Sequence, residues 1–276
     1  MKENGDILDK ILLIEHLLGH EKMQNKNYLK EYLANHKTGY ELIGPIGDHH
    51  FTQLFSVLHD DDLVFKIDDD TVFIANGTFE NMVEDYLKND RFITSANVVN
   101  HHTFSPIHRN MNILVPFYEL NNKSWIQGSI EEKINETSIF KKCITKRLLN
   151  WRDKPECAAI AHENLLYYAY KNNFNLTLYD FKIYDMNSFS YEAWRINFIL
   201  FRGNVVNKIH IKYKNVESDE QIITELLTQD NNKHCFAVGA AVVAHFAYST
   251  DNNFIYLNKT NILSNYEKLS IDYFKN

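Results

Sequence analysis

Three consecutive aspartates, Asp68, Asp69 and Asp70, directly follow an apolar run in the stretch LVFKIDDDTVFI. If the strand pattern continues through them, side chains alternate between faces, so Asp68 and Asp70 point the same way and Asp69 points opposite. Two unit charges ~5 Å apart repel by about 3 kcal/mol at an effective dielectric constant near 20. A divalent cation reverses that sign, and carboxylate oxygens suit Mg²⁺ and Mn²⁺. The sequence therefore predicts a metal site at Asp68 and Asp70, at the carboxyl end of a buried strand.

A solvated acidic turn between the two strands of a hairpin is the competing interpretation of these residues. Tight hairpin turns favour Asn-Gly or Asp-Gly, and neither dipeptide occurs in this stretch. Lys66 falls on the same strand face as Asp68. It either pairs with Asp68, which we favour, or contacts a phosphate group of a ligand.

Further polar residues lie where a ligand would be bound beside such a site. Asn97 and Asn100 lie at the end of a predicted strand and are candidates for hydrogen bonds to sugar or ribose hydroxyls. Arg195 can fork onto hydroxyls or phosphate. The neighbouring Trp194 either stacks on a sugar or belongs to the core.

Strand-like and helix-like segments alternate along the chain and must position these residues. Strands are predicted over 40–43, 62–67, 71–74, 91–99, 198–201, 208–212 and 238–248. Helices are predicted over 6–18, 27–35, 50–58, 79–88, 162–172, 219–227 and 262–273. The alternation predicts an α/β fold with helices flanking a sheet, as a single domain over 1–276 with a helical N-terminal segment over 1–36. Within that segment the apolar run 11–14 could form a short strand, but its flanks and spacing favour the helix.

The composition narrows the classes of partner and compartment. The chain has 276 residues, a formal net charge of −7 and a hydrophobic content of 45%. An acidic chain is a poor candidate for nucleic-acid binding, which needs a basic face. No signal-peptide pattern and no apolar run of about 18 residues is present, so we expect a soluble, cytoplasmic protein without a membrane span. The three widely spaced cysteines argue against a disulfide framework and fit a reducing compartment.

Five segments carry a resemblance to a known family. They are VFKIDDDTVFI, RFITSANVVNHH, AHENLLYYAY, YEAWRINFILF and GAAVVAHFAY, in this order over roughly residues 40–270. The set resembles metal-dependent GT-A-type glycosyltransferases of fungi and of chloroviruses, which are large viruses of algae. The viral members include enzymes that build capsid glycans, one of them a xylosyltransferase. A DxD motif alone is generic, whereas five segments in order are much more specific.

The resemblance implies a GT-A (Rossmann-like) mixed sheet and a reaction. Mn²⁺ or Mg²⁺ would bridge Asp68 and Asp70 to the diphosphate of a UDP-sugar, with UDP-xylose suggested as donor and a glycan or glycoprotein as acceptor. His245 would be the third metal ligand, and an imidazole favours Mn²⁺ over Mg²⁺. The alternative for His245 is a core histidine bonded to backbone. A viral member would act in the host cytoplasm.

The resemblance also assigns the remaining roles. Glu163, expected at a helix start, would be the catalytic base of an inverting reaction, or else an ordinary helix-capping residue. Asp219 and Glu192 are the reserve candidates for the base. The donor-binding set would be Lys66, Asp69, Asn97, Asn100 and Arg195.

Two other classes of function remain open at this point. Paired aspartates also serve nucleotidyltransferases and phosphatases, and a chain of this fold can bind carbohydrate without catalysis. No P-loop and no G-x-G-x-x-G motif is present. One departure from the family is the expected helical N-terminal segment, because typical members open with a strand that carries uridine contacts. Those contacts are therefore not carried over, and only 40–47 is offered for that pocket, from its position.

Overall fold

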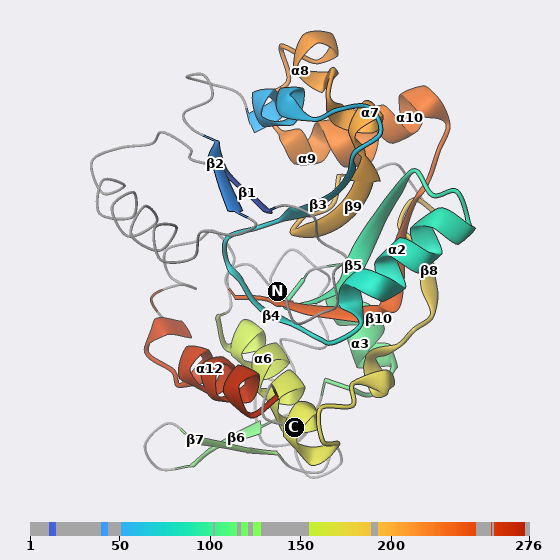
Figure 1. Ribbon diagram of the computed structural model, residues 1–276. Helices are drawn as coiled ribbons and strands as arrows, with labels where there is room; N and C mark the ends of the chain where they lie inside the picture. The colour runs from blue at the N-terminus through green and yellow to red at the C-terminus, as the bar shows by residue number, and fades with distance from the viewer. Residues whose placement is uncertain are drawn as a thin grey trace. The chain divides into compact units, whose positions relative to one another are not determined.

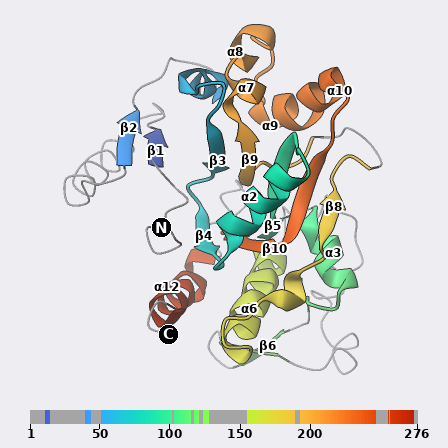
Figure 2. The same cartoon turned by 45° about the vertical axis from the view of Figure 1, so that its right-hand side comes forward.

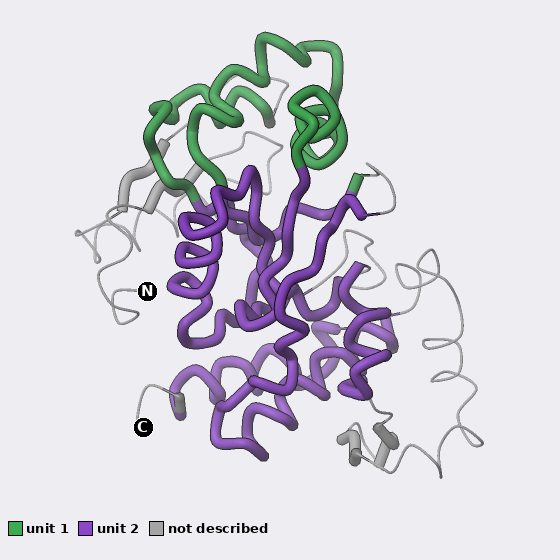
Figure 3. Tube along the Cα trace, turned by 90° about the vertical axis from the view of Figure 1, so that its right-hand side faces the viewer, with its two compact units in different colours: residues 1–64, 191–193, 201–233 green, residues 65–190, 194–200, 234–276 purple. Residues whose placement is uncertain are grey.

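The computed structural model describes residues 11–14, 40–43, 51–101, 103–114, 117–120, 124–127, 155–188, 193–246, 255 and 257–273. The chain forms two compact units, which Figure 3 shows in different colours. Unit 1 comprises residues 1–64, 191–193 and 201–233, and unit 2 comprises residues 65–190, 194–200 and 234–276. The single domain over 1–276 stays a prediction.

A mixed six-stranded sheet forms the centre of the fold (Figure 1). Its strand order is β3-β9-β5-β10-β4, and β8 pairs with β10 off this path. β10 runs parallel to β5 and antiparallel to both β4 and β8. The expected α/β fold with a mixed open sheet flanked by helices is therefore confirmed. The strands are β3 (Leu63–Ile67), β4 (Thr71–Ile74), β5 (Ile93–Val99), β8 (Ile183–Asp185), β9 (Phe198–Arg202) and β10 (Cys235–His245).

The long strand β10 organises unit 2. Its first half pairs with β8 and its end pairs with β4, while β5 follows it on the other side. β5 is buried at every position, as expected for a strand whose two faces are both covered. The register of β10 against β5 shifts between Val238 and Val242. Asn97 fills this irregularity by donating to the carbonyl oxygen of Gly239 at 3.0 Å.

Gly239 sits where β10 passes very close to the segment before β8. Its N–H donates to the carbonyl oxygen of Lys182 at 2.6 Å. A Cβ atom at this position would lie 2.4 Å from the backbone nitrogen of Phe181 and 2.7 Å from that of Lys182. Because both neighbours are backbone atoms, no side-chain rotation can relieve the overlap. Only glycine fits here.

We expect Gly239→Ala to lower the free energy of unfolding by roughly 2–4 kcal/mol, since overpacking against backbone forces the strand to shift. Urea denaturation measures the effect. Ala240→Ser, at the exposed neighbouring position, is the matched control and should change stability by less than about 0.5 kcal/mol. Equal losses in both variants would contradict the close approach.

Four helices of unit 2 pack against the sheet (Figures 1 and 2). α2 (Thr78–Lys88) packs on β5 and β10, and α3 (Phe104–Asn110) packs on β5. α6 (Pro155–Lys171) and α12 (Ile262–Tyr273) lie side by side, against β5 and β4 respectively. The helices expected over 79–88 and 262–273 are confirmed, whereas α3 was not predicted.

Apolar residues of the sheet, α6 and α12 form one core cluster. In α6 the small residues of the first turns let the helix approach the sheet closely, because six consecutive positions from 157 to 162 are buried. α2 packs through a second group of rings, in which Phe65 lies edge-on to Phe79 and to Phe198. The two groups together bury the strands that carry the polar residues described below.

Cys157 in α6 is disulfide-bonded, and its partner lies outside the described residues. Cys235 in β10 is a free, buried thiol. The expectation of an unpaired set of cysteines is therefore wrong for Cys157. Sequence spacing does not show pairing, because a disulfide depends on how closely the fold brings two Cβ atoms together.

Unit 1 contains a parallel pair of short strands and a group of helical segments. β1 (Ile11–Ile14) pairs in parallel with β2 (Tyr40–Ile43) over all four residues. The strand at 40–43 is confirmed, and the helix expected over 6–18 is wrong at 11–14. A short apolar run fits a buried strand or a helix equally well, and here strand pairing decides. The rest of 1–36, including the helix expected over 27–35, lies outside the described residues.

The helical segments of unit 1 correct one further prediction. Residues 208–212 alternate like a strand, yet the structure forms the short helix α8 (Ile209–Lys212). Ile209 is buried and Ile211 is 66% exposed, so the two isoleucines do not share a buried strand face. The helix expected over 219–227 is confirmed as a continuous run with a π-helical middle. That run consists of α9 (Asp219–Gln221), η4 (Ile222–Leu226) and α10 (Leu227–Asn231). The other helical segments of unit 1 are η1 (Phe51–Val57) and α7 (Gly203–Val206).

Two smaller features complete the description. β6 (Phe117–Leu120) and β7 (Ser124–Gln127) form an antiparallel pair apart from the main sheet. A 3₁₀ turn, η3 (Thr177–Tyr179), follows α6. Residues 128–154 lie outside the described residues. Within the described part of the chain, no helix is both long and apolar enough to cross a membrane.

Candidate metal centre

The aspartates lie in the turn that joins β3 to β4. These two strands stand at opposite ends of the sheet order, so the expected acidic turn is present but the hairpin is not. The Thr71 N–H donates to the carbonyl oxygen of Asp68 at 3.2 Å and closes the turn. Asp69 is exposed, while Asp68 and Asp70 are half-buried. The shared direction predicted for Asp68 and Asp70 thus arises from a turn, because β3 ends before the aspartates begin.

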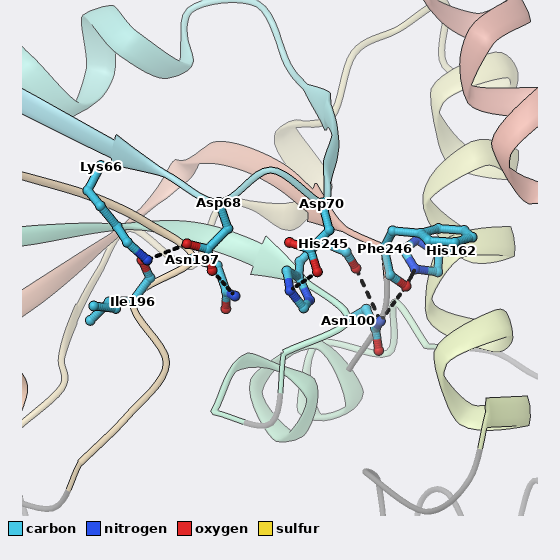
Figure 4. A network of polar contacts seen from close by, with 9 residues as sticks. All are labelled: Lys66, Asp68, Asp70, Asn100, His162, Ile196, Asn197, His245 and Phe246. Carbon is cyan, nitrogen blue, oxygen red and sulfur yellow. Dashed lines mark hydrogen bonds and ion pairs between the residues drawn. The ribbon is translucent and has the colours of Figure 1, made fainter. Parts of the chain in front are cut away.

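Asp68 is held by donors on both oxygens (Figure 4). The Lys66 ammonium group pairs with Oδ1 and also donates to the carbonyl oxygen of Ile196 at 3.0 Å. The Asn197 amide donates to Oδ2 at 2.8 Å. The backbone N–H of Asp68 donates to the carbonyl oxygen of Asn197 at 2.9 Å. The expected pairing of Lys66 with Asp68 is confirmed, and its geometry fixes this carboxylate in place.

His245 lies at the end of β10, directly against Asp70. Its Nε2 atom is 2.7 Å from Oδ2 of Asp70. A register irregularity between Ala244 and His245 brings His245 opposite Thr71, and the N–H of Phe246 donates to the carbonyl oxygen of Asp70 at 2.9 Å. Such bulges redirect side chains next to functional sites. The sequence of β10 alone left open whether His245 belongs to the core or to this site, and the structure places it beside the aspartates.

The donor atoms of Asp68, Asp70 and His245 have the spacing of metal ligands. One ligand atom from each lies within 4.8 Å of the others. A ligand distance of ~2.1 Å places neighbouring ligands of an octahedral ion about 3.0 Å apart and opposite ones about 4.2 Å apart. Oδ1 of Asp70 is buried and has no hydrogen-bond partner among the described residues. Two carboxylates, an imidazole and an unpaired buried oxygen therefore fit a divalent cation.

Asn100 supports this arrangement from behind and corrects its predicted role. It is fully buried, and its amide donates to the carbonyl oxygens of His245 at 3.1 Å and Phe246 at 3.0 Å. Its φ angle of 63° is in the left-handed region, where asparagine is enriched. The expected contact with a ligand hydroxyl is thus replaced by a structural contact, which fixes the end of β10 that carries His245.

Asn97 is also a structural residue and not a ligand contact. It is fully buried, and its amide donates to the carbonyl oxygens of Tyr179 and Gly239. Nε2 of His108 lies 2.7 Å from Oδ1 of Asn97. Burial lowers the pKa of His108 to about 3, so the ring is neutral and donates this hydrogen bond. With both ends of its amide engaged in the core, Asn97 is not available to a sugar.

Glu163 lies in the middle of α6, which corrects the expected helix start. The apolar residues before it already belong to the helix, because small buried residues continue the helical spacing back to Pro155. No helix N-terminus therefore stabilises its carboxylate. Glu163 is half-buried, and burial raises its pKa from 4.5 to about 7. A pKa near neutrality is the property that a general base needs.

The residue before Glu163 ties α6 to the strand end that carries His245. Nε2 of His162 lies 2.9 Å from the carbonyl oxygen of Phe246, and Nδ1 lies 2.9 Å from the hydroxyl of Tyr266. Burial lowers the pKa of His162 to about 4, so the neutral ring donates from Nε2 and accepts the Tyr266 hydroxyl at Nδ1. α6, α12 and the end of β10 are thereby joined by one buried polar network.

The other predicted residues are distributed around the fold. Arg195 is half-buried, and its carbonyl oxygen lies 3.2 Å from Nε2 of His101. Trp194 is buried, which favours its core interpretation. Asp219 begins α9 in unit 1, where its carboxylate accepts the N–H of Glu220, while Ser218 is the N-cap of that helix. Glu192 lies outside the described residues, and the roles of Asp69, Arg195 and Asp219 stay predictions.

Sequence reasoning missed Asn197. It lies in the segment YEAWRINFILF, immediately before β9, in which only Arg195, Trp194 and Glu192 were predicted as site residues. An asparagine directly preceding four buried apolar residues was the available signal. Its pairing with Asp68 depends on the neighbouring positions of β3 and β9, which the sequence does not show.

Comparison of the chain with protein-family models, curated proteins and solved structures finds no match.

Proposed function

We propose that this chain is a metal-dependent glycosyltransferase of the GT-A type. It would transfer a sugar from a nucleotide-sugar, with a UDP-sugar as the expected donor, to a hydroxyl group of a glycan. The observation that carries the proposal is the convergence of Asp68, Asp70 and His245, which come from segments far apart in the sequence. The resemblance of the five segments adds the reaction class. The strand β1 belongs to a two-stranded sheet with β2 and not to the main sheet, so it supplies no support from the family pattern.

Several residues of the chain would bind the cation or position its ligands. Asp68, Asp70 and His245 would hold Mn²⁺ or Mg²⁺, and Asn100 keeps the strand end of His245 in place. Lys66 offsets part of the carboxylate charge and holds Asp68 still. A bound cation would stabilise the charge that develops on the departing nucleoside diphosphate.

Glu163 is the proposed base of an inverting transfer. Above a pH of about 7 its carboxylate is ionised and can accept the proton of the acceptor hydroxyl. The partly buried position keeps the carboxylate basic, since fewer waters compete for it. Its ionisation state would therefore control the rate near neutral pH.

A phosphatase or nucleotidyltransferase would use similar ligands. Two-metal enzymes of these classes hold two ions about 3.5–4 Å apart. In the described part of the chain, the structure brings together one group of three such ligands. This observation favours a one-ion site and so favours the glycosyltransferase.

The proposal predicts a metal-dependent release of UDP. We expect the purified chain to release UDP from at least one of UDP-xylose, UDP-glucose, UDP-galactose and UDP-N-acetylglucosamine in the presence of Mn²⁺. EDTA should lower the rate by about 100-fold or more, because charge stabilisation worth several kcal/mol is lost, and excess Mn²⁺ should restore it. Coupled detection of UDP gives the rate.

Two outcomes would count against the proposal. One is the absence of UDP release from every donor by a folded protein that binds Mn²⁺. The other is cleavage of p-nitrophenyl phosphate at a rate that exceeds UDP release, which would point to the phosphatase class. A folded chain that binds glycans but never consumes a donor would support the non-catalytic alternative.

A further inference from the structure

Asn197 meets Asp68 through both its backbone and its side chain. The carbonyl oxygen of Asn197 accepts the N–H of Asp68 at 2.9 Å, and its side-chain amide donates to Oδ2 at 2.8 Å. Figure 4 shows the amide next to the Asp68 carboxylate. The double contact leaves the side chain little freedom to rotate. Asn197 thus has a fixed orientation beside a proposed metal ligand.

The oxygen of the same amide has no partner in the part of the chain that the structure describes. Asn197 is only 5% exposed, and its Oδ1 atom is buried without a hydrogen bond. Leaving a buried acceptor unpaired costs about 1–3 kcal/mol, so such an atom calls for a partner such as an ion or an ordered water. Oδ1 of Asp70 is unpaired in the same way. Two buried oxygens beside one group of ligands both lack a positive partner.

We propose that Asn197 is a fourth protein ligand of the cation, with its NH₂ group orienting Asp68 and its Oδ1 atom binding the ion. This inference rests on the cation site of the proposed function. Amide oxygens are common ligands of hard divalent cations. A neutral oxygen also suits a site that already contains two carboxylates and a single lysine, because it adds a ligand without adding repulsion. The ion would satisfy the acceptor that the protein leaves unpaired.

Binding of Mn²⁺ alone to the full chain tests the inference without any sugar donor. Isothermal titration gives the affinity, and thermal unfolding with and without saturating Mn²⁺ gives the stabilisation. We expect Asn197→Leu to weaken Mn²⁺ binding by about 10–100-fold. We expect Asn197→Asp, which keeps an oxygen ligand, to bind within about threefold of the wild type. Its stabilisation by Mn²⁺ should therefore be close to that of the wild type, because stabilisation at a given Mn²⁺ concentration follows the affinity.

The controls separate the possible failures. Asn172→Asp, at the exposed position directly after α6, adds the same charge elsewhere and should leave Mn²⁺ binding unchanged. If the wild type binds no Mn²⁺, both the cation site and this inference fail. If the wild type binds and Asp70→Ala does not, but Asn197→Leu binds normally, only the inference on Asn197 fails. Equal loss of binding in the Leu and Asp variants would assign Asn197 to support of Asp68 alone, and would also overturn the inference. If the Leu variant does not fold, the Asp variant still decides.

Discussion

Asp70→Ala is expected to lower the affinity for Mn²⁺ by at least about 100-fold and UDP release by roughly 10²–10⁴-fold. Asp70 contributes one carboxylate oxygen at 2.7 Å from the His245 imidazole and a second that is buried and unpaired. Removing it leaves Asp68 and His245 as the two remaining members of the three-ligand group. Asp68 is also already engaged by Lys66 and Asn197, so it has less capacity to compensate.

Asp69→Ala is the matched control for this experiment. Asp69 carries the same charge in the same turn but is exposed, so its removal should change Mn²⁺ affinity by less than about threefold. Titration of each variant with Mn²⁺, followed by UDP release at saturating metal, separates binding from catalysis. If both variants bind equally well, the ion is not held by Asp70, and the proposed centre is wrong.

Glu163→Gln is expected to lower the rate of sugar transfer to an acceptor, measured as UDP release, by about 10²–10⁴-fold while leaving Mn²⁺ affinity unchanged. In the wild type the rate should rise with pH through a pKa of about 7, as the carboxylate of Glu163 becomes ionised. The glutamine cannot ionise and should lack this limb of the pH profile. Retention of the wild-type rate and profile in the variant would exclude Glu163 as the base.

The same substitution should change stability in the opposite direction from activity. Burial raises the pKa of Glu163 in the folded protein from 4.5 to about 7, so folding favours the protonated form. The contribution of Glu163 to the free energy of unfolding is complete below pH 4.5 and is lost as the pH rises through 7. Since one pKa unit corresponds to about 1.4 kcal/mol, the loss amounts to as much as ~3 kcal/mol above pH 8.

Denaturation of wild type and Glu163→Gln at pH 4 and pH 8.5 measures this difference. We expect the variant to be more stable than the wild type at pH 8.5 and nearly equal to it at pH 4. Glu225→Gln, at a half-buried position in unit 1, is the matched control and should show no such gain. A variant that is less stable than the wild type at the higher pH would show that the Glu163 carboxylate is stabilised as an anion.

Much of the sheet and part of the site followed from sequence pattern. The strand before the aspartates, the strand over 91–99 and the C-terminal helix have clear periods of apolar residues, and the structure forms all three. The pairing of Lys66 with Asp68 was also predicted, from strand alternation, although Asp68 lies just beyond the end of β3. These features depend on local spacing, which a sequence records directly.

The wrong predictions concern contacts between distant segments. Asn97 and Asn100 have the residue type of ligand contacts, but their partners are carbonyl oxygens of β10 and of the segment before β8. The helix containing Glu163 begins earlier than expected, since its small residues resemble a loop until they are packed against the sheet. Asn197 gained its significance only when β9 came to lie beside β3.

The turn that carries the aspartates has a consequence for how this protein can evolve. It is three residues long, and it connects strands at the two ends of the sheet order, while the backbone of Asp70 accepts the N–H of Phe246 at its far end. An inserted or deleted residue would displace β4 along β10 and carry Asp70 away from His245. Homologous chains that keep the activity should therefore preserve the length of this link.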